Sequence, residues 1–462
     1  MTVPASGELS LGKIRQELET SDYSAGPYTT NATSLSGSET GLYAAINTAS
    51  PSYPNGTAPF AMSEWYSYNH AATSFYYSTP VTVSFTTNVI PWCDYDRMAG
   101  SLWITSYGHE YGSTSETLDL KIIDSSDFST KASKTVTYRP GESTNQAQRK
   151  AFNTCTIGTG SAGIGVYNDT LRDLTGFILK DNDTLTTSTI DTTHWLFNPR
   201  VYYGGFHNSN HYFAAAGHGT GNNGPTTAVF RIDSALSTFT KLTSSPFQPF
   251  TNIFNYFNEG VFLNTTGPTL YFLFLYNYSN TTGTVRATVL EIDTSTNSIS
   301  NSLTNTGFIT STNMGLSRAN PGFGVNIADN YAIVPIYMSA GYTRLHLIKW
   351  DPSIPALTIE DTLNITSGYG ADISLNPIDS GSFKDNQDTG KLLLTARTGS
   401  QIIMGTLDFT TSSLGSLTNI VEISSTARSF PVTRVIDSSQ DLNFASFGAD
   451  NKPQLWSGSG YL

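Results

Sequence analysis

Residues Thr227–Thr243 read TAVFRIDSALSTFTKLT: an apolar strand that ends in Ile-Asp, a short polar turn, and a second strand. Alternating or continuous apolar runs bounded by polar turns are typical of β-strands. The same pattern of strand, aspartate and turn occurs six times along the chain. Its aspartates lie 52 to 60 residues apart, at Asp124, Asp181, Asp233, Asp293, Asp351 and Asp408. A pattern that returns at a near-constant spacing predicts a repeat architecture.

A complete repeat after residue 75 contains four predicted strands. In the fourth repeat these strands are 260–264, 270–278, 287–293 and 297–303. The seventh repeat has three strands and stops at Leu462, whereas Thr79–Asn88 is a strand without partners of its own. Pairing this strand with the last repeat closes a ring and removes open sheet edges. The sequence therefore predicts an all-β fold, a seven-bladed β-propeller over residues 76–462. Six blades is the alternative, because the first two repeats are the least regular.

The composition excludes several classes of function. Charged residues make up 13% of the 462 residues, aromatic residues 12%, and the net charge is -12. An acidic chain without a basic stripe is a poor candidate for binding nucleic acid or an anionic membrane. No apolar run approaches the roughly 20 residues that span a bilayer, and the N-terminus does not resemble a secretory signal. Two cysteines cannot form a disulfide framework, and a Cys93–Cys155 bridge remains an alternative to two free thiols.

Residues 1–75 differ from the repeats and predict a small region of short helices. SLGKIRQELET places Leu11, Ile14 and Leu18 on one helix face behind a Ser10 N-cap. A second helix is predicted around Leu42 and Ile46, and a third short segment contains Trp65 and Tyr66. Such short pieces do not bury a core alone, so we expect them to dock on the ring or on a neighbouring chain.

Two stretches of this region resemble known proteins: MTVPASGELSLGKIRQEL at the start, and Ala61–Tyr66 (AMSEWY) with Tyr68 and His70 after it. They resemble the N-terminal regions of tailed-bacteriophage virion structural proteins, over about 70 residues; an ordinary N-terminal arm is the alternative. The resemblance implies a tail or head appendage, assembled in the host cytoplasm, exposed on the particle surface and present in several copies. It implies no catalytic residues, and it implies anchoring to other virion proteins through Leu11, Ile14, Leu18, Trp65 and Tyr66.

One edge of the predicted ring is expected to bind a ligand, because long connections and the turns between second and third strands meet there. Tyrosine rings stack on sugars while amides and hydroxyls satisfy sugar hydroxyl groups, so the residues there favour a host-surface glycan or protein receptor. Packing between blades is the alternative role. The candidate residues are His109, Tyr111, Tyr167, Trp195, His218, Phe254, Tyr256, Tyr276, Tyr278 and Tyr337. The aspartates at the opposite edge are expected to cap turns.

The sequence shows no convincing catalytic centre. Its seven histidines lack metal-binding spacing, and no phosphate loop, dinucleotide fingerprint or Gly-x-Ser-x-Gly motif occurs. We therefore expect no metal, no cofactor and no enzymatic activity. A glycan-cleaving propeller with Glu110 and Glu259 as its carboxylate pair is one alternative, and a purely architectural virion component is the other.

Overall fold

The computed structural model shows the strands of the ring and parts of the N-terminal region. The described residues are 10–20, 23, 34, 38, 54, 59, 61–66, 68, 76–77, 81–82, 94–98, 101–107, 116–124, 129–138, 152–156, 162–168, 174–191, 197–218, 225–242, 255–264, 267–278, 284–310, 324–338, 342–365, 372–377, 391–398, 401–424, 432–435, 442–447 and 453–459. By contacts, the chain divides into two compact units, Met1–Tyr77 with Gly458–Leu462, and Ser78–Ser457.

The described strands of the ring form seven antiparallel sheets, numbered here in chain order. Sheets 1 to 3 contain β3 (Asp94–Met98), β4 (Ser101–Tyr107), β5 (Glu116–Asp124) and β6 (Thr130–Tyr138); β7 (Phe152–Thr156), β8 (Ala162–Asn168), β9 (Leu174–Lys180) and β10 (Leu185–Asp191); and β11 (Phe197–His207), β12 (Asn210–His218), β13 (Pro225–Asp233) and β14 (Phe239–Lys241).

Sheets 4 to 7 continue the same order of strands. They contain β15 (Asn255–Asn264), β16 (Thr269–Tyr278), β17 (Thr284–Asp293) and β18 (Ser298–Thr310); β19 (Val325–Ala328), β20 (Tyr331–Met338), β21 (Tyr342–Asp351) and β22 (Ala356–Ile365); β23 (Asp372–Pro377), β24 (Lys391–Thr398), β25 (Gln401–Phe409) and β26 (Leu414–Ser424); and β27 (Val432–Val435), β28 (Leu442–Phe447) and β29 (Pro453–Ser459), joined by β1 (Tyr76–Tyr77) and β2 (Val81–Thr82).

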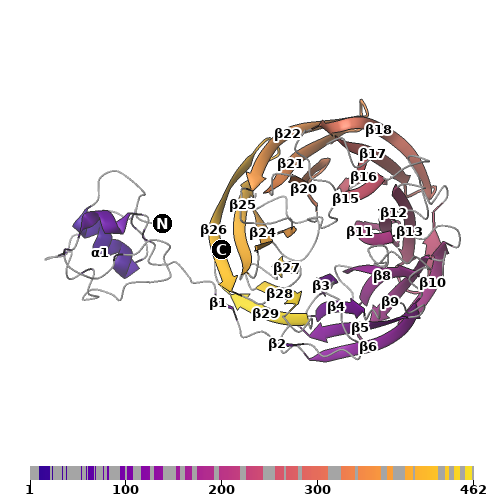
Figure 1. Cartoon of the computed structure of the whole chain (residues 1–462), viewed down its shortest axis with the longest axis horizontal. Helices are drawn as coiled ribbons and strands as arrows, with labels where there is room; N and C mark the ends of the chain where they lie inside the picture. The colour runs from indigo at the N-terminus through magenta and orange to yellow at the C-terminus, as the bar shows by residue number, and fades with distance from the viewer. Residues whose placement is uncertain are drawn as a thin grey trace. The chain divides into compact units, whose positions relative to one another are not determined.

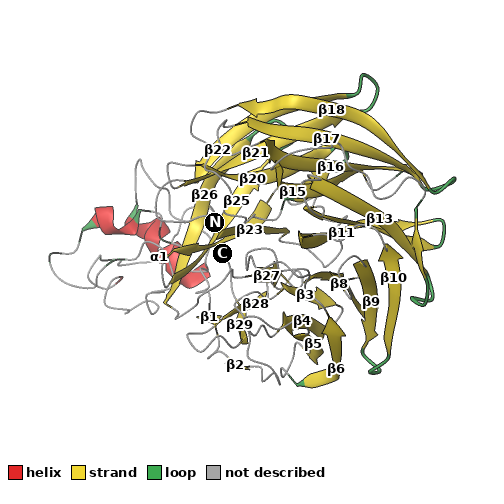
Figure 2. Ribbon diagram, turned by 45° about the vertical axis from the view of Figure 1, so that its right-hand side comes forward, coloured by secondary structure: helices red, strands yellow, loops and turns green. Residues whose placement is uncertain are grey.

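The seven sheets stand around a circle (Figure 1). Their first strands contact one another in chain order, from β3 through β7, β11, β15, β19 and β23 to β27, and β27 contacts β3. Figure 2 shows the strands of sheet 4, β15 to β18, stepping from the inside of the ring to its outside. The predicted all-β class is confirmed, and the arrangement is that of a β-propeller.

The last sheet takes its outer strands from the start of the chain. Val81 pairs with Leu455 and Thr82 with Gln454, inside the segment 79–88 that the sequence analysis expected to close the ring. A second short pairing, of Tyr76–Tyr77 with β29, lies just before that segment. The two stretches leave β29 paired on both of its sides within the described residues.

The core of the ring lies between neighbouring sheets. The third strands of sheets 4 and 5, β17 and β21, have the same order of buried and half-buried residues over their ten positions. Val289 packs toward sheet 5, whereas Leu290 packs toward sheet 3. Because both faces are covered at the middle of these strands, four consecutive residues are buried there, 287–290 in β17 and 345–348 in β21.

The N-terminal unit has a small core of its own. Helix α1 (Leu11–Thr20) begins after Ser10, whose hydroxyl accepts the Lys13 amide at 3.3 Å, as predicted for an N-cap. A one-turn helix, η1, follows at Met62–Trp65. Ile14, Leu18, Tyr23, Trp65 and Tyr68 are buried against one another. The expectation that these pieces need another domain for a core is therefore wrong. The predicted second helix, around Leu42 and Ile46, lies outside the described residues.

The helices that the structure describes are short and polar. Among the described residues no helix is long and apolar enough to cross a membrane.

Candidate ligand-binding edge of the ring

The two edges of the ring differ in their connections. We call turn edge the side where first strands turn into second strands and third strands into fourth strands; it includes residues 208–209, 234–238, 294–297, 329–330 and 352–355. We call loop edge the opposite side, where second strands end, third strands begin, and the chain passes from one sheet to the next. The sequence analysis expected the ligand at the loop edge.

Three of the repeated aspartates at the turn edge, Asp233, Asp293 and Asp351, cap their own turns, as predicted. Asp233 accepts the Ser237 amide and hydroxyl, both at 2.7 Å. Asp293 accepts the Ser295 amide at 2.8 Å and the Thr296 hydroxyl at 2.7 Å. These bonds, first of all the one from the Ser295 hydroxyl, lower the pKa of Asp293 to about 2. Hydrogen bonds to the charged form hold a carboxylate ionised, so these groups serve the turns.

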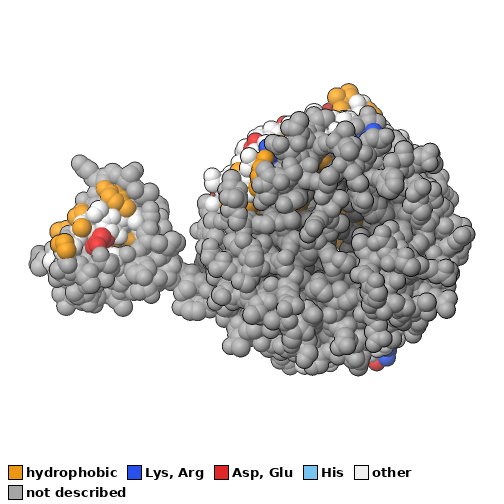
Figure 3. All heavy atoms as spheres, viewed as in Figure 1, with side chains coloured by type: hydrophobic (Ala, Val, Ile, Leu, Met, Phe, Trp, Pro, Cys, Tyr) orange, Lys and Arg blue, Asp and Glu red, His pale blue; other side chains and the backbone are white. Residues whose placement is uncertain are grey.

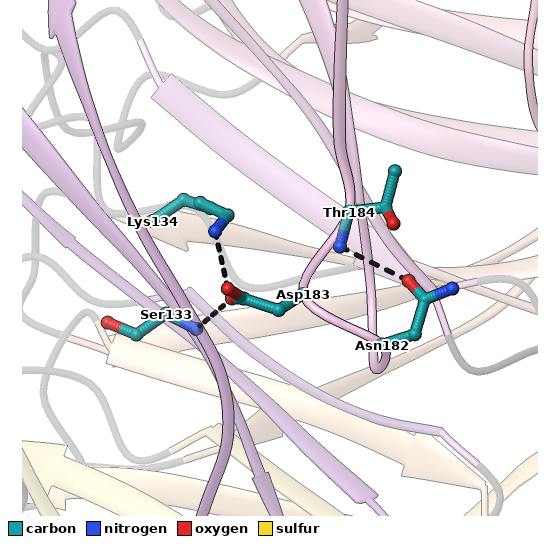
Figure 4. Close-up of polar contacts among 5 residues, drawn as sticks. All are labelled: Ser133, Lys134, Asn182, Asp183 and Thr184. Atoms are coloured by element: carbon teal, nitrogen blue, oxygen red, sulfur yellow. Dashed lines mark hydrogen bonds and ion pairs between the residues drawn. The ribbon is translucent and has the colours of Figure 1, made fainter.

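Sheets 1, 2 and 3 are tied together near the turn edge. Asp183 lies in the turn between β9 and β10, where its φ of 65° is in the left-handed region. Its carboxylate accepts the Ser133 amide of sheet 1 at 2.9 Å and forms an ion pair with Lys134 (Figure 4). The hydrogen bond from Lys134 is the main cause that lowers the pKa of Asp183. Lys180 of sheet 2 donates to the Ala235 carbonyl of sheet 3 at 3.0 Å.

The ties between sheets 3, 4 and 5 come from amide and phenol groups, of which those of Tyr212 and Asn326 are buried. The Tyr212 hydroxyl of sheet 3 lies 3.1 Å from the Thr294 carbonyl oxygen and 2.9 Å from Asn297 Oδ1, both in sheet 4. Asn208 Nδ2 donates to the same Thr294 carbonyl at 3.2 Å. In sheet 5, Asn326 Nδ2 reaches the Leu263 carbonyl of sheet 4 at 3.0 Å. The described polar groups of the turn edge are therefore largely committed to holding the ring together.

The loop edge brings four of the candidate residues to corresponding positions. Tyr167, His218, Tyr278 and Tyr337 each occupy the last or second-last position of the second strand, in sheets 2, 3, 4 and 5. Tyr256 belongs to the same edge, because it is the second residue of β15 and pairs with Asn277. Five of the ten candidates thus share one edge of four consecutive sheets.

Tyr276 does not belong to a surface patch. Its side chain is fully buried, and it packs with Phe274 and Phe272 in the core between sheets 3 and 4. Burial raises the pKa of its phenol to about 12. For this residue the alternative role, packing between blades, is correct. The sequence pattern alone did not show that Tyr276 is buried.

Four candidates lie outside the described residues: His109, Tyr111, Trp195 and Phe254. Strand β4 is described as far as Tyr107, and His109 and Tyr111 follow it outside the described residues.

The structure adds two residues that the sequence analysis did not select. Tyr107 ends the second strand of sheet 1, and Phe447 ends that of sheet 7. Sheet 6 is the exception, since β24 ends in Arg397–Thr398. An aromatic residue therefore occupies one of the last two positions of the second strand in six of the seven described sheets. Knowing where each strand ends would have found both residues.

Charge is sparse on the described surface. The space-filling view shows a few acidic and basic side chains scattered among polar and apolar ones near the rim (Figure 3). No group of three or more His, Cys, Asp or Glu among the described residues is placed to hold a metal ion. His211 and His346 are buried singly rather than in a cluster.

The five expected anchoring residues all lie in the described part of the N-terminal unit. Ile14, Leu18 and Trp65 are at most 1% exposed and form the small core of that unit. Leu11 and Tyr66 are half-buried. The buried three therefore hold the unit together instead of facing a partner, which corrects their expected role.

No protein-family model matches the chain, and no curated protein matches it. Several solved structures resemble it. The polysaccharide lyase Uly1 has 7% identity and a TM-score of 0.45, with 78% of this chain and 88% of that chain covered. An alpha-L-arabinanase from Penicillium chrysogenum has 10% identity and a TM-score of 0.38, covering 83% and 98%. The Dos1 propeller has 9% identity and a TM-score of 0.42, covering 77% and 74%.

These matches correct one expectation of the sequence analysis. We expected a protein without enzymatic activity, whereas the similar structures include a polysaccharide lyase and an arabinanase, which are enzymes. The expectation is withdrawn. At such identities and TM-scores, the likeness assigns no particular reaction to this chain.

Proposed function

We propose that this protein is a seven-bladed propeller that acts on a carbohydrate through its loop edge. The observation that supports the proposal is the difference between the two edges. At the turn edge, the described polar groups cap turns and tie sheets, as Asp183, Asn326 and Tyr212 do. At the loop edge, an aromatic residue occupies one of the last two positions of the second strand in six sheets.

The chemistry of these residues suits a sugar. An aromatic ring offers an apolar face to sugar C–H groups, and a tyrosine hydroxyl adds a hydrogen bond at the ring's tip. The chain is rich in Ser, Thr and Asn, whose hydroxyl and amide groups both donate and accept, as sugar hydroxyls require. With charged residues at 13%, recognition by shape and hydrogen bonding is favoured over ion pairing.

Binding to immobilised polysaccharides tests the proposal. We expect Tyr278→Ala, at the loop edge of sheet 4, to weaken binding about tenfold, as loss of a buried aromatic anchor does. Ile354→Ala is the matched control, because Ile354 is 69% exposed at the turn edge of sheet 5. Equal binding by both variants and the wild type, or no binding to any polysaccharide, contradicts the proposal.

Cleavage of the bound glycan is the second candidate function. Glu259 lies in β15, the first strand of sheet 4, beside a register shift between Phe257 and Glu259. Such bulges re-aim side chains and are frequent next to active sites. Its proposed partner, Glu110, lies outside the described residues. Shortened polysaccharide products that form with the wild type and fail to form with Glu259→Gln support cleavage; intact polysaccharide in both reactions contradicts it.

We propose separately, on the resemblance of residues 1–70 alone, that the chain is part of a phage particle. The N-terminal region would attach it to other virion proteins, with several copies displayed on the surface. Weak sites gain strongly in avidity when several are tethered together. Gold-labelled antibodies against the ring should decorate intact particles at a fixed position. Absence of the chain from purified particles contradicts this proposal.

A further inference from the structure

The aromatic positions of the loop edge form a series that runs from sheet to sheet. They are Tyr107 in sheet 1, Tyr167 in sheet 2, His218 in sheet 3, Tyr278 in sheet 4, Tyr337 in sheet 5 and Phe447 in sheet 7. Sheets 7 and 1 are neighbours across the closure of the ring, since β27 contacts β3. The series is therefore continuous through six sheets and interrupted at sheet 6.

The register of the strands places four of these positions opposite the first three residues of the third strand, and Tyr107 pairs with Leu118, the third residue of β5. His218 pairs with Pro225, the first residue of β13, and Asn168, next to Tyr167, pairs with Leu174, the first residue of β9. Met338, next to Tyr337, pairs with Tyr342, the first residue of β21. His218 thus stands opposite the start of the third strand, and Tyr167 and Tyr337 lie one residue before that point, so the positions share the loop edge without being equivalent in register.

The ties at the turn edge hold neighbouring sheets at the same height. Lys180 reaches Ala235 of the next sheet, and Asn208 reaches Thr294 of the next. Packed sheets stand about 10 Å apart, which is more than the width of one sugar ring. A ligand that uses two of the aromatic positions must therefore be a chain of several sugars.

This inference rests on the proposed function. We propose that the ligand is an extended glycan chain that crosses several sheets of the loop edge, and that Tyr107 and Phe447 belong to its path. Sheet 6, where Arg397 and Thr398 replace the aromatic residue, lies outside the path. A pocket for one terminal sugar would need a single convergent group of side chains rather than a series spread over six sheets.

The dependence of affinity on chain length tests this inference. We use malto-, cello- and arabino-oligosaccharides of one to eight units, with titration calorimetry on the full chain. In the series that binds, affinity should rise at least tenfold between the mono- and the hexasaccharide. Affinity that is independent of length overturns the extended path while leaving carbohydrate binding intact. Absence of binding to every series and to its parent polysaccharide overturns both proposals.

Variants along the series locate the path. Tyr278→Ala, in the middle, should weaken hexasaccharide binding about tenfold and flatten the dependence on length. Tyr107→Ala should weaken only the longer oligosaccharides. Thr398→Ala, at the equivalent position of sheet 6, is the control and should bind like the wild type. Thermal unfolding of each variant separates lost binding from lost folding. The inference is overturned if the Tyr107→Ala and Tyr278→Ala variants both fold normally and bind oligosaccharides of every length as the wild type does.

Discussion

The buried histidines of the ring make stability depend on pH. His346 on β21 is 1% exposed, and burial lowers its pKa to about 4, with the charge of Arg344 acting in the same direction. Burial likewise lowers the pKa of His211 to about 4. In the unfolded chain a histidine titrates near 6.5. Above that pH both states are neutral; between 6.5 and 4 the unfolded state alone takes up the proton, so stability falls as pH falls.

We predict that His346 alone lowers the free energy of unfolding by about 3 kcal/mol between pH 7.5 and pH 4.5, since each pKa unit corresponds to 1.36 kcal/mol. Urea unfolding at the two pH values measures the difference. His346→Leu removes the titrating group, so its pH dependence should be smaller by that amount. An unchanged pH dependence in His346→Leu contradicts the prediction.

Asn326 is a second residue whose role can be measured. It is 8% exposed, and its Nδ2 lies within 3.0 Å of the carbonyl oxygens of Leu263, Ala328 and Tyr331. Asn326→Ala leaves buried carbonyls without a donor, which costs about 2 kcal/mol. Asn364→Ala is the control, because Asn364 is exposed on β22 and accepts one bond from Arg344. Equal loss of stability in the two variants contradicts the assigned role.

At the scale of elements, the close packing of neighbouring sheets depends on glycines in the first strands. A Cβ at Gly260 of β15 would lie 2.5 Å from Phe272 and 3.0 Å from Tyr202 of sheet 3. At Gly204 of β11 a Cβ would lie 2.6 Å from Phe262 of sheet 4. Both distances are shorter than ordinary contact, so these first strands accept no larger residue without moving an aromatic ring.

We predict that Gly260→Ala destabilises the ring by about 1–3 kcal/mol, the usual cost of overpacking a well-filled core. Gly307→Ala on β18 is the matched control, since a Cβ there would meet nothing within 4 Å. Thermal unfolding compares the two. If Gly260→Ala melts with or above Gly307→Ala, the interface between sheets 3 and 4 is looser than the structure shows.

At the scale of the whole molecule, the ring depends on a pairing between residues at opposite ends of the chain. Thr82 stands opposite Gln454 and Val81 opposite Leu455. Facing Cα atoms in an antiparallel pair are about 4.5–5.5 Å apart, within the range that a disulfide bridges. Without this pairing β29 would keep an open edge, and an open edge favours aggregation.

We predict that the double variant Thr82→Cys/Gln454→Cys forms a disulfide under oxidation and gains about 2–4 kcal/mol of stability, because the bond closes a very long loop. Denaturant unfolding with and without a reductant measures the gain. A variant that stays reduced under oxidising conditions, or a gain that survives reduction, contradicts the closure.

Much of the fold could be predicted from the sequence because the signals are local. Each aspartate such as Asp233 or Asp293 follows an apolar strand and precedes a polar turn, and both cap their turns in the structure. The ends of the strands were harder to predict, because the last residues of a strand follow no sharp sequence pattern. Tyr107 and Phe447, the last described residues of β4 and β28, were not selected for this reason.

The candidate site was less predictable for a physical reason. Tyr276 is of the same residue type as the other candidates, and only the packing of sheet 4 against sheet 3 shows that its ring is buried. The N-terminal helices posed the same problem. Ile14 and Trp65 are far apart in sequence, and no local signal indicates that they pack together.

The amino-acid sequence by itself determined the repeat, its strands and the turn-capping role of the aspartates, because periodicity and turn chemistry act between residues near one another in the chain. The tertiary structure decided what depends on distant contacts that no sequence pattern indicated: the ties from Asp183 and Asn326 between sheets, and the burial of Tyr276. It also decided which aromatic residues share the loop edge, since that depends on where every sheet stands in the ring.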